Sequence, residues 1–190
     1  TIDMRQFLDI LAIAVIADIM PLIDINRTLV KEGLKLIKTS NRPSSIIIRD
    51  FLNKGTITSE DIGYQIAPRI NSAGRLEDAS IALDFYTATT IQDAYKQFEL
   101  LGKLNDLRKE TEAQTTAEAM KAVNEEDKLI VVAGEGWHEG VVGIVASRLV
   151  DKFAKPAIVL SVENGIAKGS ARSIGDVSIY ELIKANEHYL

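Results

Sequence analysis

The sequence of 190 residues lacks cysteine altogether, which excludes disulfides and thiolate metal sites. It also lacks a long hydrophobic run, because the longest uncharged apolar stretch, residues 10–17, is far shorter than the roughly 20 residues that cross a membrane. An excess of positive charge is missing too, since 22 basic and 27 acidic residues leave a formal net charge of −5. A protein that coats nucleic acid by bulk electrostatics is therefore disfavoured, and any such contact should come from a few placed cations. Together these absences predict a cytoplasmic protein with no membrane partner.

What is present is an ordinary globular composition, with 46% apolar and 26% charged residues. In the first 90 residues, apolar side chains recur at the 3.6-residue spacing of helices. This spacing, together with the capping residues, glycines and prolines, predicts five helices, over residues 3–17, 26–40, 44–53, 58–67 and 78–88. Asn26 is the expected N-cap of the second helix, and Gly55 is the expected terminator of the third.

Residues 90–124 consist mostly of helix formers, with Gly102 as the single interruption, and predict one long helix. Its apolar stripe lapses between residues 108 and 116, which predicts a solvent-bridging middle and hence a connector between two lobes. The pattern then changes to strands at 129–133, 156–162 and 166–173, helices at 141–153 and 176–185, and a hairpin turn at Asn164–Gly165. The expected fold class is α/β, with a mostly helical first part, a long connector helix and an α/β end.

Two short segments place arginine among small residues, and both are suited to binding an anion. The first is residues 68–75, read as a loop after the preceding helix, with Arg69, Asn71 and Arg75; the second is residues 169–173, with Arg172 between Ser170 and Ser173. A guanidinium can bind phosphate oxygens in a bidentate manner, so the two segments predict two walls of one phosphate-binding cleft. The alternative is that both are ordinary turns, with Arg172 paired to a surface carboxylate.

Two further features could carry chemistry. Asp18 follows eight uncharged apolar residues and is a candidate ligand for a hard divalent cation, although it could instead cap the next turn. No other tight group of Asp, Glu or His lies nearby, so a two-metal site could not be completed here. The glycine-rich residues 134–140 separate a strand from a helix and could receive an anion, with Trp137 and His138 at the mouth. The alternative is a flexible loop with an exposed histidine.

Four segments, at residues 17–22, 67–76, 134–148 and 169–173, occur in an order that resembles the single-stranded-DNA-specific 5′→3′ exonucleases of the DHH phosphoesterase family. The resemblance implies that residues 1–89 are the last part of a DHH catalytic domain, 90–126 a connector helix and 127–190 the first part of a DHHA1 domain. The Asp-rich and Asp-His-His metal motifs of this family belong before Thr1, and its Gly-Gly-His segment belongs after Leu190. The chain is therefore expected to be an internal fragment that is inactive alone.

The resemblance also implies a mechanism and partners. A two-metal phosphodiesterase using Mn²⁺ or Mg²⁺ would have Asp18 as one metal ligand and Arg75 as a catalytic residue that positions the scissile phosphate. The implied binding residues for single-stranded DNA and its phosphates are Arg69, Asn71, Arg75, His138, Ser170, Arg172 and Ser173. The connector would set a cleft width that admits a single strand, and the setting would be DNA repair and recombination, with a helicase or single-strand-binding protein as possible partners.

Two alternative functions stay open at this point. One is a phosphodiesterase of short oligonucleotides or cyclic dinucleotides. The other is a non-catalytic scaffold that binds nucleic acid.

Overall fold

The computed structural model of the chain describes residues 3–189, and it divides into one unit that ends at Asp106 and a second that begins at Leu107. The fold class is α/β, as predicted, because helices predominate and a small sheet lies in the second unit. The boundary between the units falls inside the long helix α7 (Ile91–Ala122). The domain limits expected at 89/90 and 126/127 stay predictions.

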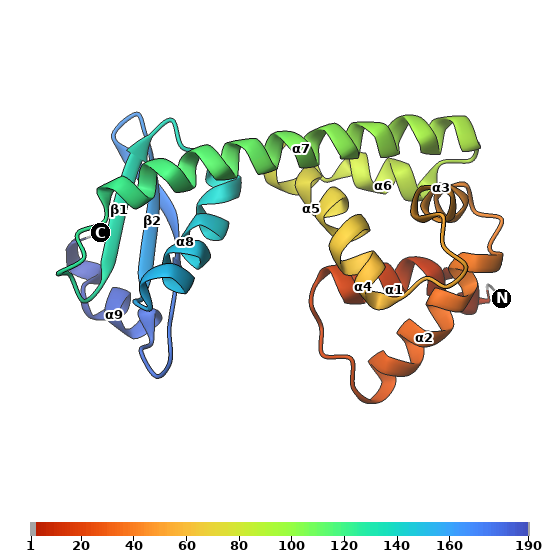
Figure 1. Cartoon of the computed structure of the whole chain (residues 1–190), viewed down its shortest axis with the longest axis horizontal. Coiled ribbons are helices and arrows are strands. Elements are labelled where there is room, and N and C mark those ends of the chain that lie inside the picture. Colours follow the sequence, from red (N-terminus) through yellow and green to blue (C-terminus); the bar gives the residue numbers. More distant parts are fainter. Residues whose placement is uncertain (1–2, 190) are drawn as a thin grey trace. The chain divides into compact units, whose positions relative to one another are not determined.

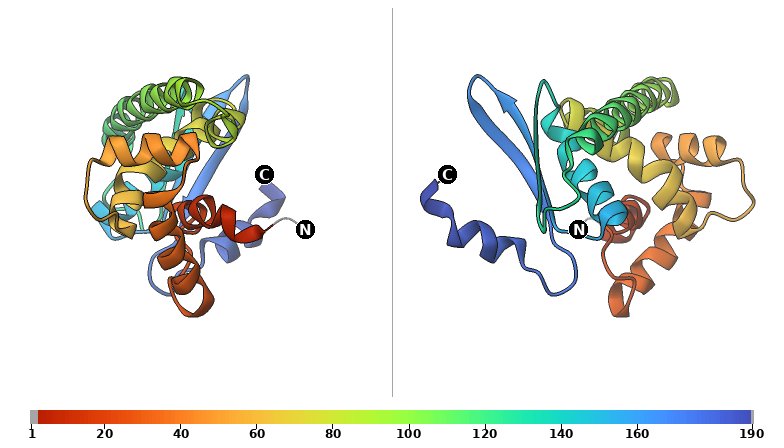
Figure 2. Two further views of the ribbon diagram at one scale, coloured as in Figure 1. Left: turned by 90° about the vertical axis from the view of Figure 1, so that its right-hand side faces the viewer. Right: turned by 60° about the vertical axis from the view of Figure 1, so that its left-hand side comes forward.

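The first unit is built from helices (Figure 1). Its elements before α7 are η1 (Met4–Phe7), α1 (Leu8–Ala17), α2 (Asp24–Thr39), α3 (Pro43–Leu52), α4 (Ser59–Asp61), η2 (Ile62–Ile66), α5 (Ala67–Leu76) and α6 (Ser80–Thr87). α2 packs along α1 (Figure 2), where Val30 meets Ala12 and Val15. The main core includes Ile48, Ile62, Phe85 and Leu101, all at 0% exposure, so the first part of α7 belongs to this core.

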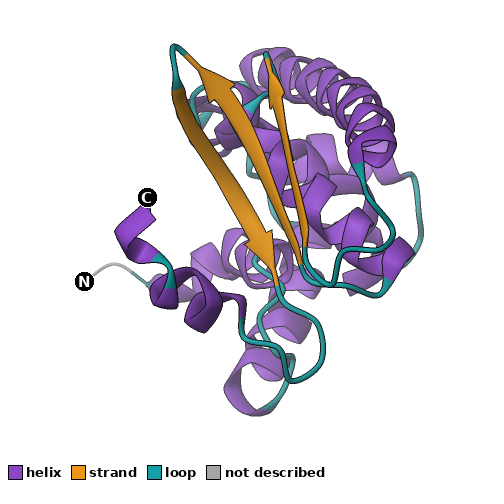
Figure 3. Ribbon diagram, turned by 90° about the vertical axis from the view of Figure 1, so that its left-hand side faces the viewer, coloured by secondary structure: helices purple, strands orange, loops and turns teal. Residues whose placement is uncertain are grey.

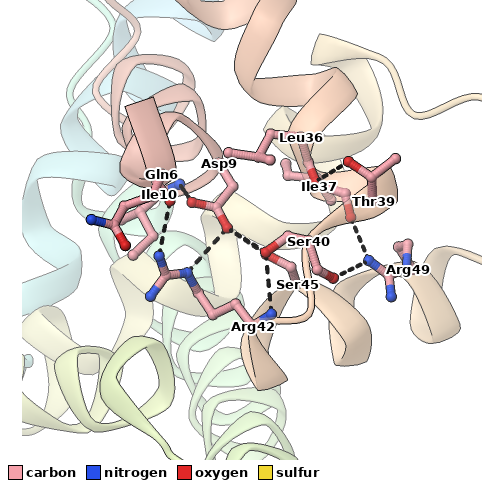
Figure 4. A network of polar contacts seen from close by, with 10 residues as sticks. All are labelled: Gln6, Asp9, Ile10, Leu36, Ile37, Thr39, Ser40, Arg42, Ser45 and Arg49. Atoms are coloured by element: carbon pink, nitrogen blue, oxygen red, sulfur yellow. Dashed lines mark hydrogen bonds and ion pairs between the residues drawn. The ribbon is translucent and has the colours of Figure 1, made fainter. Parts of the chain in front are cut away.

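A buried carboxylate fixes the start of this unit. Asp9 on α1 is fully buried, and its Oδ2 accepts hydrogen bonds from Ser40 Oγ, Arg42 Nε and Ser45 Oγ at 3.1, 3.1 and 2.9 Å (Figure 4). The Ile10 backbone N–H donates to Oδ1 at 2.9 Å. A buried charge is tolerated when it is paired and hydrogen-bonded, so Asp9 ties α1 to the turn between α2 and α3.

The segment 68–75 is a helix, and its prediction as a loop is wrong. The helix that starts at a capping box between Thr58 and Asp61 passes through a π-helical turn, η2, and continues as α5. Pro68 lies in the first turn of α5, where its missing N–H is tolerated, and the Ala67 N–H donates to the carbonyl of Ile62 in the wider π pattern. The proline therefore changes the helical pitch locally without ending the helix.

One predicted helix start and one predicted helix terminator are also wrong. α2 begins at Asp24, before the predicted N-cap Asn26, whose Nδ2 instead donates to the Pro21 carbonyl at 3.1 Å. α3 ends at Leu52, close to its predicted end at residue 53, but the residue that terminates it is Asn53 and not Gly55, because Asn53 itself adopts the left-handed conformation with φ 45°. Asparagine is one of the few residues other than glycine that often adopts this conformation.

The second unit combines the last part of α7 with a sheet (Figure 3). Its further elements are β1 (Ile130–Glu135), α8 (Glu139–Phe153), β2 (Ala157–Glu163), β3 (Ile166–Arg172), α9 (Ile179–Ala185) and η3 (Glu187–Tyr189). In the described sheet, β1 pairs in parallel with β2, and β2 pairs antiparallel with β3. The predicted hairpin turn is present, with φ of 52° at Asn164 and 78° at Gly165.

The middle of α7 is not solvent-bridging, contrary to the prediction. Glu112, Thr115 and Thr116 are between 3% and 9% exposed. Glu112 forms ion pairs with Arg108, four residues earlier on the same helix, and with Arg148 on α8. One face of the polar run 108–116 therefore packs within the second unit, where the charges of Arg108 and Glu112 are paired.

Candidate metal and phosphate sites

The first unit contains a cavity of about 690 Å³ that joins three predicted site residues. Asp18, Asn71 and Arg75 all line it, beside small and apolar residues such as Ala17, Ile70 and Gly74. These residues come from the end of α1 and from α5, segments more than 50 positions apart in the sequence. The tertiary fold thus brings a carboxylate, an amide and a guanidinium into one concave site.

Asp18 presents an exposed carboxylate at the end of α1. The helix ends at Ala17, and Ile19 turns the chain with φ 54°. Within residues 3–189 the Asp18 side chain makes no hydrogen bond or ion pair, and the N-cap of α2 is Ile23, so Asp18 does not cap the next helix. A carboxylate at a helix C-terminus is electrostatically unfavourable, and the last turn of α1 has no basic residue to offset it. A bound cation would relieve this repulsion.

Asn71 and Arg75 lie one turn apart on α5, so their side chains share a face of the helix. Asn71 Nδ2 donates to the carbonyl of Ala17 at 3.3 Å, which connects α5 to the end of α1 next to Asp18. Arg75 is in the last turn of α5, where a cation is favoured by the helix dipole. The exposed Arg75 guanidinium and the Asp18 carboxylate therefore border the same cavity.

Arg69 lies elsewhere in the first unit. Its guanidinium is 4.5 Å from the ring centre of Phe51 and 5.3 Å from that of Phe98. Any side chain at Gly102 would collide with Arg69 Nη1, so the glycine provides the space for this contact. Arg69 packs α5 against α3 and α7 and does not line the cavity with Arg75. Its predicted contact with phosphate stays untested.

A second cluster surrounds Arg172 in the second unit. Arg172 Nε donates to Ser147 Oγ at 3.1 Å, and Nη1 donates to Ser170 Oγ at 3.2 Å and to the Ala171 carbonyl at 2.9 Å. Among the described residues no carboxylate pairs with Arg172, which counts against the alternative of a surface ion pair. The guanidinium is thus held in one orientation while its charge is not neutralised.

Sequence reasoning missed the two α8 residues that support Arg172. Ser147 Oγ donates to the carbonyl of Gly143, one turn earlier. A Cβ on Gly143 would lie 3.1 Å from Ser170 Oγ and 3.3 Å from Arg172 Nη2, so only a small residue fits there comfortably. The available signal was the spacing of two small residues, Gly143 and Ser147, at i and i+4 on one face of the predicted helix.

Ser173 and the 134–140 segment differ from their predicted arrangement. The Ser173 hydroxyl accepts from the Ile179 N–H at 3.1 Å and so supports the turn before α9. Trp137 is not at a mouth: it is 8% exposed, and its Nε1 donates to Glu118 Oε2 at 2.8 Å. His138 is exposed and is the N-cap of α8, with Nδ1 accepting from the Gly140 N–H at 3.0 Å. The segment is therefore an ordered helix start, in which His138 has a capping role.

The strongly shifted pKa values belong to residues outside the cavity of Asp18 and Arg75 and outside the Arg172 cluster. Lys54 and the hydroxyl and N–H of Thr58 bind the Asp61 carboxylate and lower its pKa to about 2. Burial raises the pKa of Tyr86, whose hydroxyl has no hydrogen-bond partner within the described chain, and the negative charge of Asp9 raises it further. These groups belong to the structural core and do not mark a catalytic site.

Metal binding cannot be completed by the described residues. Between residues 3 and 189 no group of three or more His, Cys, Asp or Glu side chains is placed to hold an ion. Asp18 fits the role of one oxygen ligand because it is exposed, anionic and without a partner in the described structure. No helix in the described part of the chain is long and apolar enough to span a membrane.

Comparison with known proteins finds relatives over nearly the whole chain and a family match in its second unit. Residues 126–188 match the family described as DHHA1 domain. The single-stranded-DNA-specific exonuclease RecJ of Bacillus subtilis is 40% identical over 186 residues, which cover 93% of this chain and 23% of that protein. The chain thus spans about a quarter of the length of this relative.

Two crystal structures extend the similarity to the fold. RecJ from Thermus thermophilus in complex with Mg²⁺ matches 98% of this chain and 30% of its own, with a TM-score of 0.88 and 32% identity. A manganese-bound exonuclease RecJ matches 97% of this chain and 47% of its own, with a TM-score of 0.85 and 30% identity. Over the section that it shares with these relatives, the chain therefore belongs to the RecJ family, and its residues 126–188 are a DHHA1 domain.

Proposed function

We propose that this chain is part of a metal-dependent exonuclease that hydrolyses single-stranded DNA from its 5′ end. The observation that carries the proposal is the cavity in which Asp18 and Arg75 meet, in a chain related to RecJ proteins over nearly its whole length. Carboxylate and arginine side chains around one cavity are suited to a phosphate ester held next to a divalent cation.

Asp18 would be a ligand of Mn²⁺ or Mg²⁺, the ions bound in the two related crystal structures. When bound, such ions activate water and stabilise the leaving oxygen of a phosphodiester. The other ligands must come from outside the described residues, because these contain no further group of candidate ligands. The 190-residue chain alone is therefore proposed to be inactive.

Arg75 and Asn71 would bind the phosphate at the cavity. The guanidinium offers two parallel N–H groups to phosphate oxygens, and Asn71 is already held at the end of α1 by its bond to Ala17. Fixing the phosphate in line with the attacking water supplies much of the rate enhancement in phosphoryl transfer.

The cluster around Arg172 would bind a second phosphate of the strand. Its guanidinium has no carboxylate partner within the described chain, and Ser170 adds a hydroxyl on the same face of β3. Ser173 and His138 would be less direct contributors, because the Ser173 hydroxyl and the His138 Nδ1 already accept backbone N–H groups.

The test is a chimera in which this chain replaces the matching section of the Bacillus subtilis RecJ. We expect the chimera with Mn²⁺ to degrade a long 5′-labelled single strand, and the isolated 190-residue chain to leave it intact. A dinucleotide and a duplex are the comparison substrates. A folded chimera that cleaves only the dinucleotide would favour a short-substrate phosphodiesterase, and one that binds DNA without cleaving it would favour a scaffold.

A further inference from the structure

Ile19 ends the helix α1 in a backbone conformation that isoleucine rarely adopts. Its N–H donates to the carbonyl of Ile16 at 3.1 Å. The N–H of the next residue, Met20, donates to the carbonyl of Val15 at 3.1 Å. These two bonds form a Schellman motif, in which the residue after the C-cap is left-handed, and Ile19 accordingly has φ 54°. Glycine is the usual residue at this position, whereas a β-branched side chain is strained there.

Packing within the described structure does not offset this strain. The Ile19 side chain is 89% exposed, so it gains almost nothing from leaving water. Ala154 holds the equivalent left-handed position at the end of α8, with φ 52°, but alanine is small and unbranched. Ile19 thus combines a strained backbone with an exposed apolar side chain, directly after Asp18. Strain that the surrounding structure does not require is typical of functional sites.

Ile19 also lines the cavity that contains Asp18 and Arg75. Apart from Asp18, Asn71 and Arg75, the described residues that line this cavity are all small or apolar, among them Ile19 and Ile70. A phosphate group and a metal ion would use the charged side chains but would leave the apolar lining in water. A nucleotide offers both surfaces, because its phosphate is joined to a base with flat apolar faces.

We propose that Ile19 contacts the base of the nucleotide whose phosphate Arg75 would bind. This inference rests on the proposed function, which supplies a DNA strand as the occupant of the cavity. The left-handed backbone holds the side chain at the cavity, where contact with a base removes apolar surface from water. The contact would be equally strong in the bound substrate and in the transition state. It should therefore lower KM and leave kcat nearly unchanged.

The first measurement is thermal unfolding of the whole chain, followed by circular dichroism. Ile19→Gly should raise the unfolding midpoint by about 2–4 °C, because glycine relieves the strain and an exposed side chain loses little buried surface. Ala154→Gly is the matched control, since it relieves the same conformation outside the cavity and should also raise the midpoint. Ile19→Val keeps a β-branched side chain and should give no increase.

The second measurement is steady-state cleavage by the chimera of two single strands of equal length. One is ordinary DNA, and in the other the two nucleotides at the 5′ end lack bases. Ile19→Gly should raise KM about five- to tenfold for the ordinary strand, a fraction of the effect of burying a whole isoleucine, and should leave KM for the abasic strand unchanged. Ala154→Gly should change neither value, and Ile19→Val should resemble the unmodified chimera.

Three outcomes would overturn the proposal. An equal rise in KM for both strands would mean that Ile19 packs against another part of the protein. An unchanged KM for the ordinary strand would exclude the contact, and a lower unfolding midpoint for Ile19→Gly would assign the side chain to the fold. Failure of the unmodified chimera to cleave either strand would count against the proposed function alone. The same ratios would then be measured as binding constants by fluorescence anisotropy.

Discussion

The cavity of the first unit and the Arg172 cluster of the second differ in how their charged groups are held. Asp18 has an exposed carboxylate with no partner among residues 3–189, whereas Arg172 donates to Ser147, Ser170 and the Ala171 carbonyl. A metal ligand needs open lone pairs, so a carboxylate without a partner suits that role. A phosphate-binding arginine loses less conformational entropy on binding when neutral groups already fix its orientation.

The two arginine segments, residues 68–75 and 169–173, also differ in the directions in which their side chains point. In α5 each residue turns the chain by about 100°, so Asn71 and Arg75 share a face while Arg69 points to another side. In β3 side chains alternate, so Ser170 and Arg172 lie on one face. Two segments of similar composition therefore present their arginines differently, because one is a helix and the other a strand.

The largest effect that would sharpen this comparison is expected for Asp18→Asn in the chimera. Substitution of a residue that only supports a metal ligand often lowers metal affinity or activity about ten- to a hundredfold. Loss of the ligand itself should therefore lower the cleavage rate by more than about 100-fold. The thermal unfolding temperature should not fall, because the side chain is exposed, makes no hydrogen bond within the described structure and carries a charge that is unfavourable at a helix C-terminus.

The control for Asp18 is Asp84→Asn on α6, which is exposed and does not line the cavity. Near-normal cleavage by the Asp18 variant would remove this residue from the metal site and erase the contrast between the two units.

The second largest effect is expected for Glu112→Ala, which tests the ion pairs inside the second unit. The Glu112 side chain is 3% exposed and that of Arg108 is 14% exposed, so removing the carboxylate leaves a largely buried guanidinium without this counter-charge. Removing one partner of a buried ion pair typically lowers the free energy of unfolding by about 3–5 kcal/mol. Urea unfolding of the Glu112 variant should show a loss near the lower end of this range, because the second partner, Arg148, is more exposed. Glu110→Ala, at an exposed position on the same helix, should change stability by less than about 0.5 kcal/mol.

A smaller effect is expected for Arg172→Ala. Binding of a 5′-phosphorylated single strand should weaken by about 1–3 kcal/mol, the cost of losing a charged hydrogen bond, and Ser147→Ala should cost about 1 kcal/mol because only the orientation is lost. Anisotropy with 5′-phosphorylated and 5′-hydroxyl strands separates phosphate binding from general affinity.

Lys168→Ala is the control for Arg172, since Lys168 lies on the same strand and pairs with Glu139. The two variants could instead lose equal affinity for the 5′-phosphorylated and the 5′-hydroxyl DNA. The Arg172 cluster would then contribute only nonspecific electrostatic attraction and no phosphate site.

The smallest effect concerns pH. Asp61 has a pKa of about 2 in the folded protein, below its ordinary value of 3.8, so it contributes stability above pH 3.8 that is lost as the pH falls through 2. Asp61→Asn should therefore flatten the decrease in unfolding free energy between pH 4 and 2, measured by urea unfolding at each pH. The change is expected to be small because the Lys54 side chain is 51% exposed. Parallel curves for the two proteins would exclude this role of Asp61.

Much of the local structure could be predicted from the sequence. The apolar run before Asp18, the helix start at Thr58 and the Asn164–Gly165 turn each determine structure through neighbouring residues, and each occurs as expected. The helical state of 68–75 was missed because Pro68 resembles a helix breaker unless a π turn precedes it. The burial of Glu112 was missed because a polar run is normally solvated, and its arginine partner on α8 is 36 residues away.

By itself, the sequence determined the order and type of most elements, the absence of thiol chemistry and the residue types able to bind metal or phosphate. These properties depend on composition and on contacts between residues a few positions apart. Only the tertiary structure decided that Asp18 and Arg75 line one cavity, that Arg69 is held between two rings and that Ser147 supports Arg172. Side chains far apart in the sequence are brought together by the packing of whole helices and strands. A local sequence pattern carries no information on which distant segments will be neighbours in space.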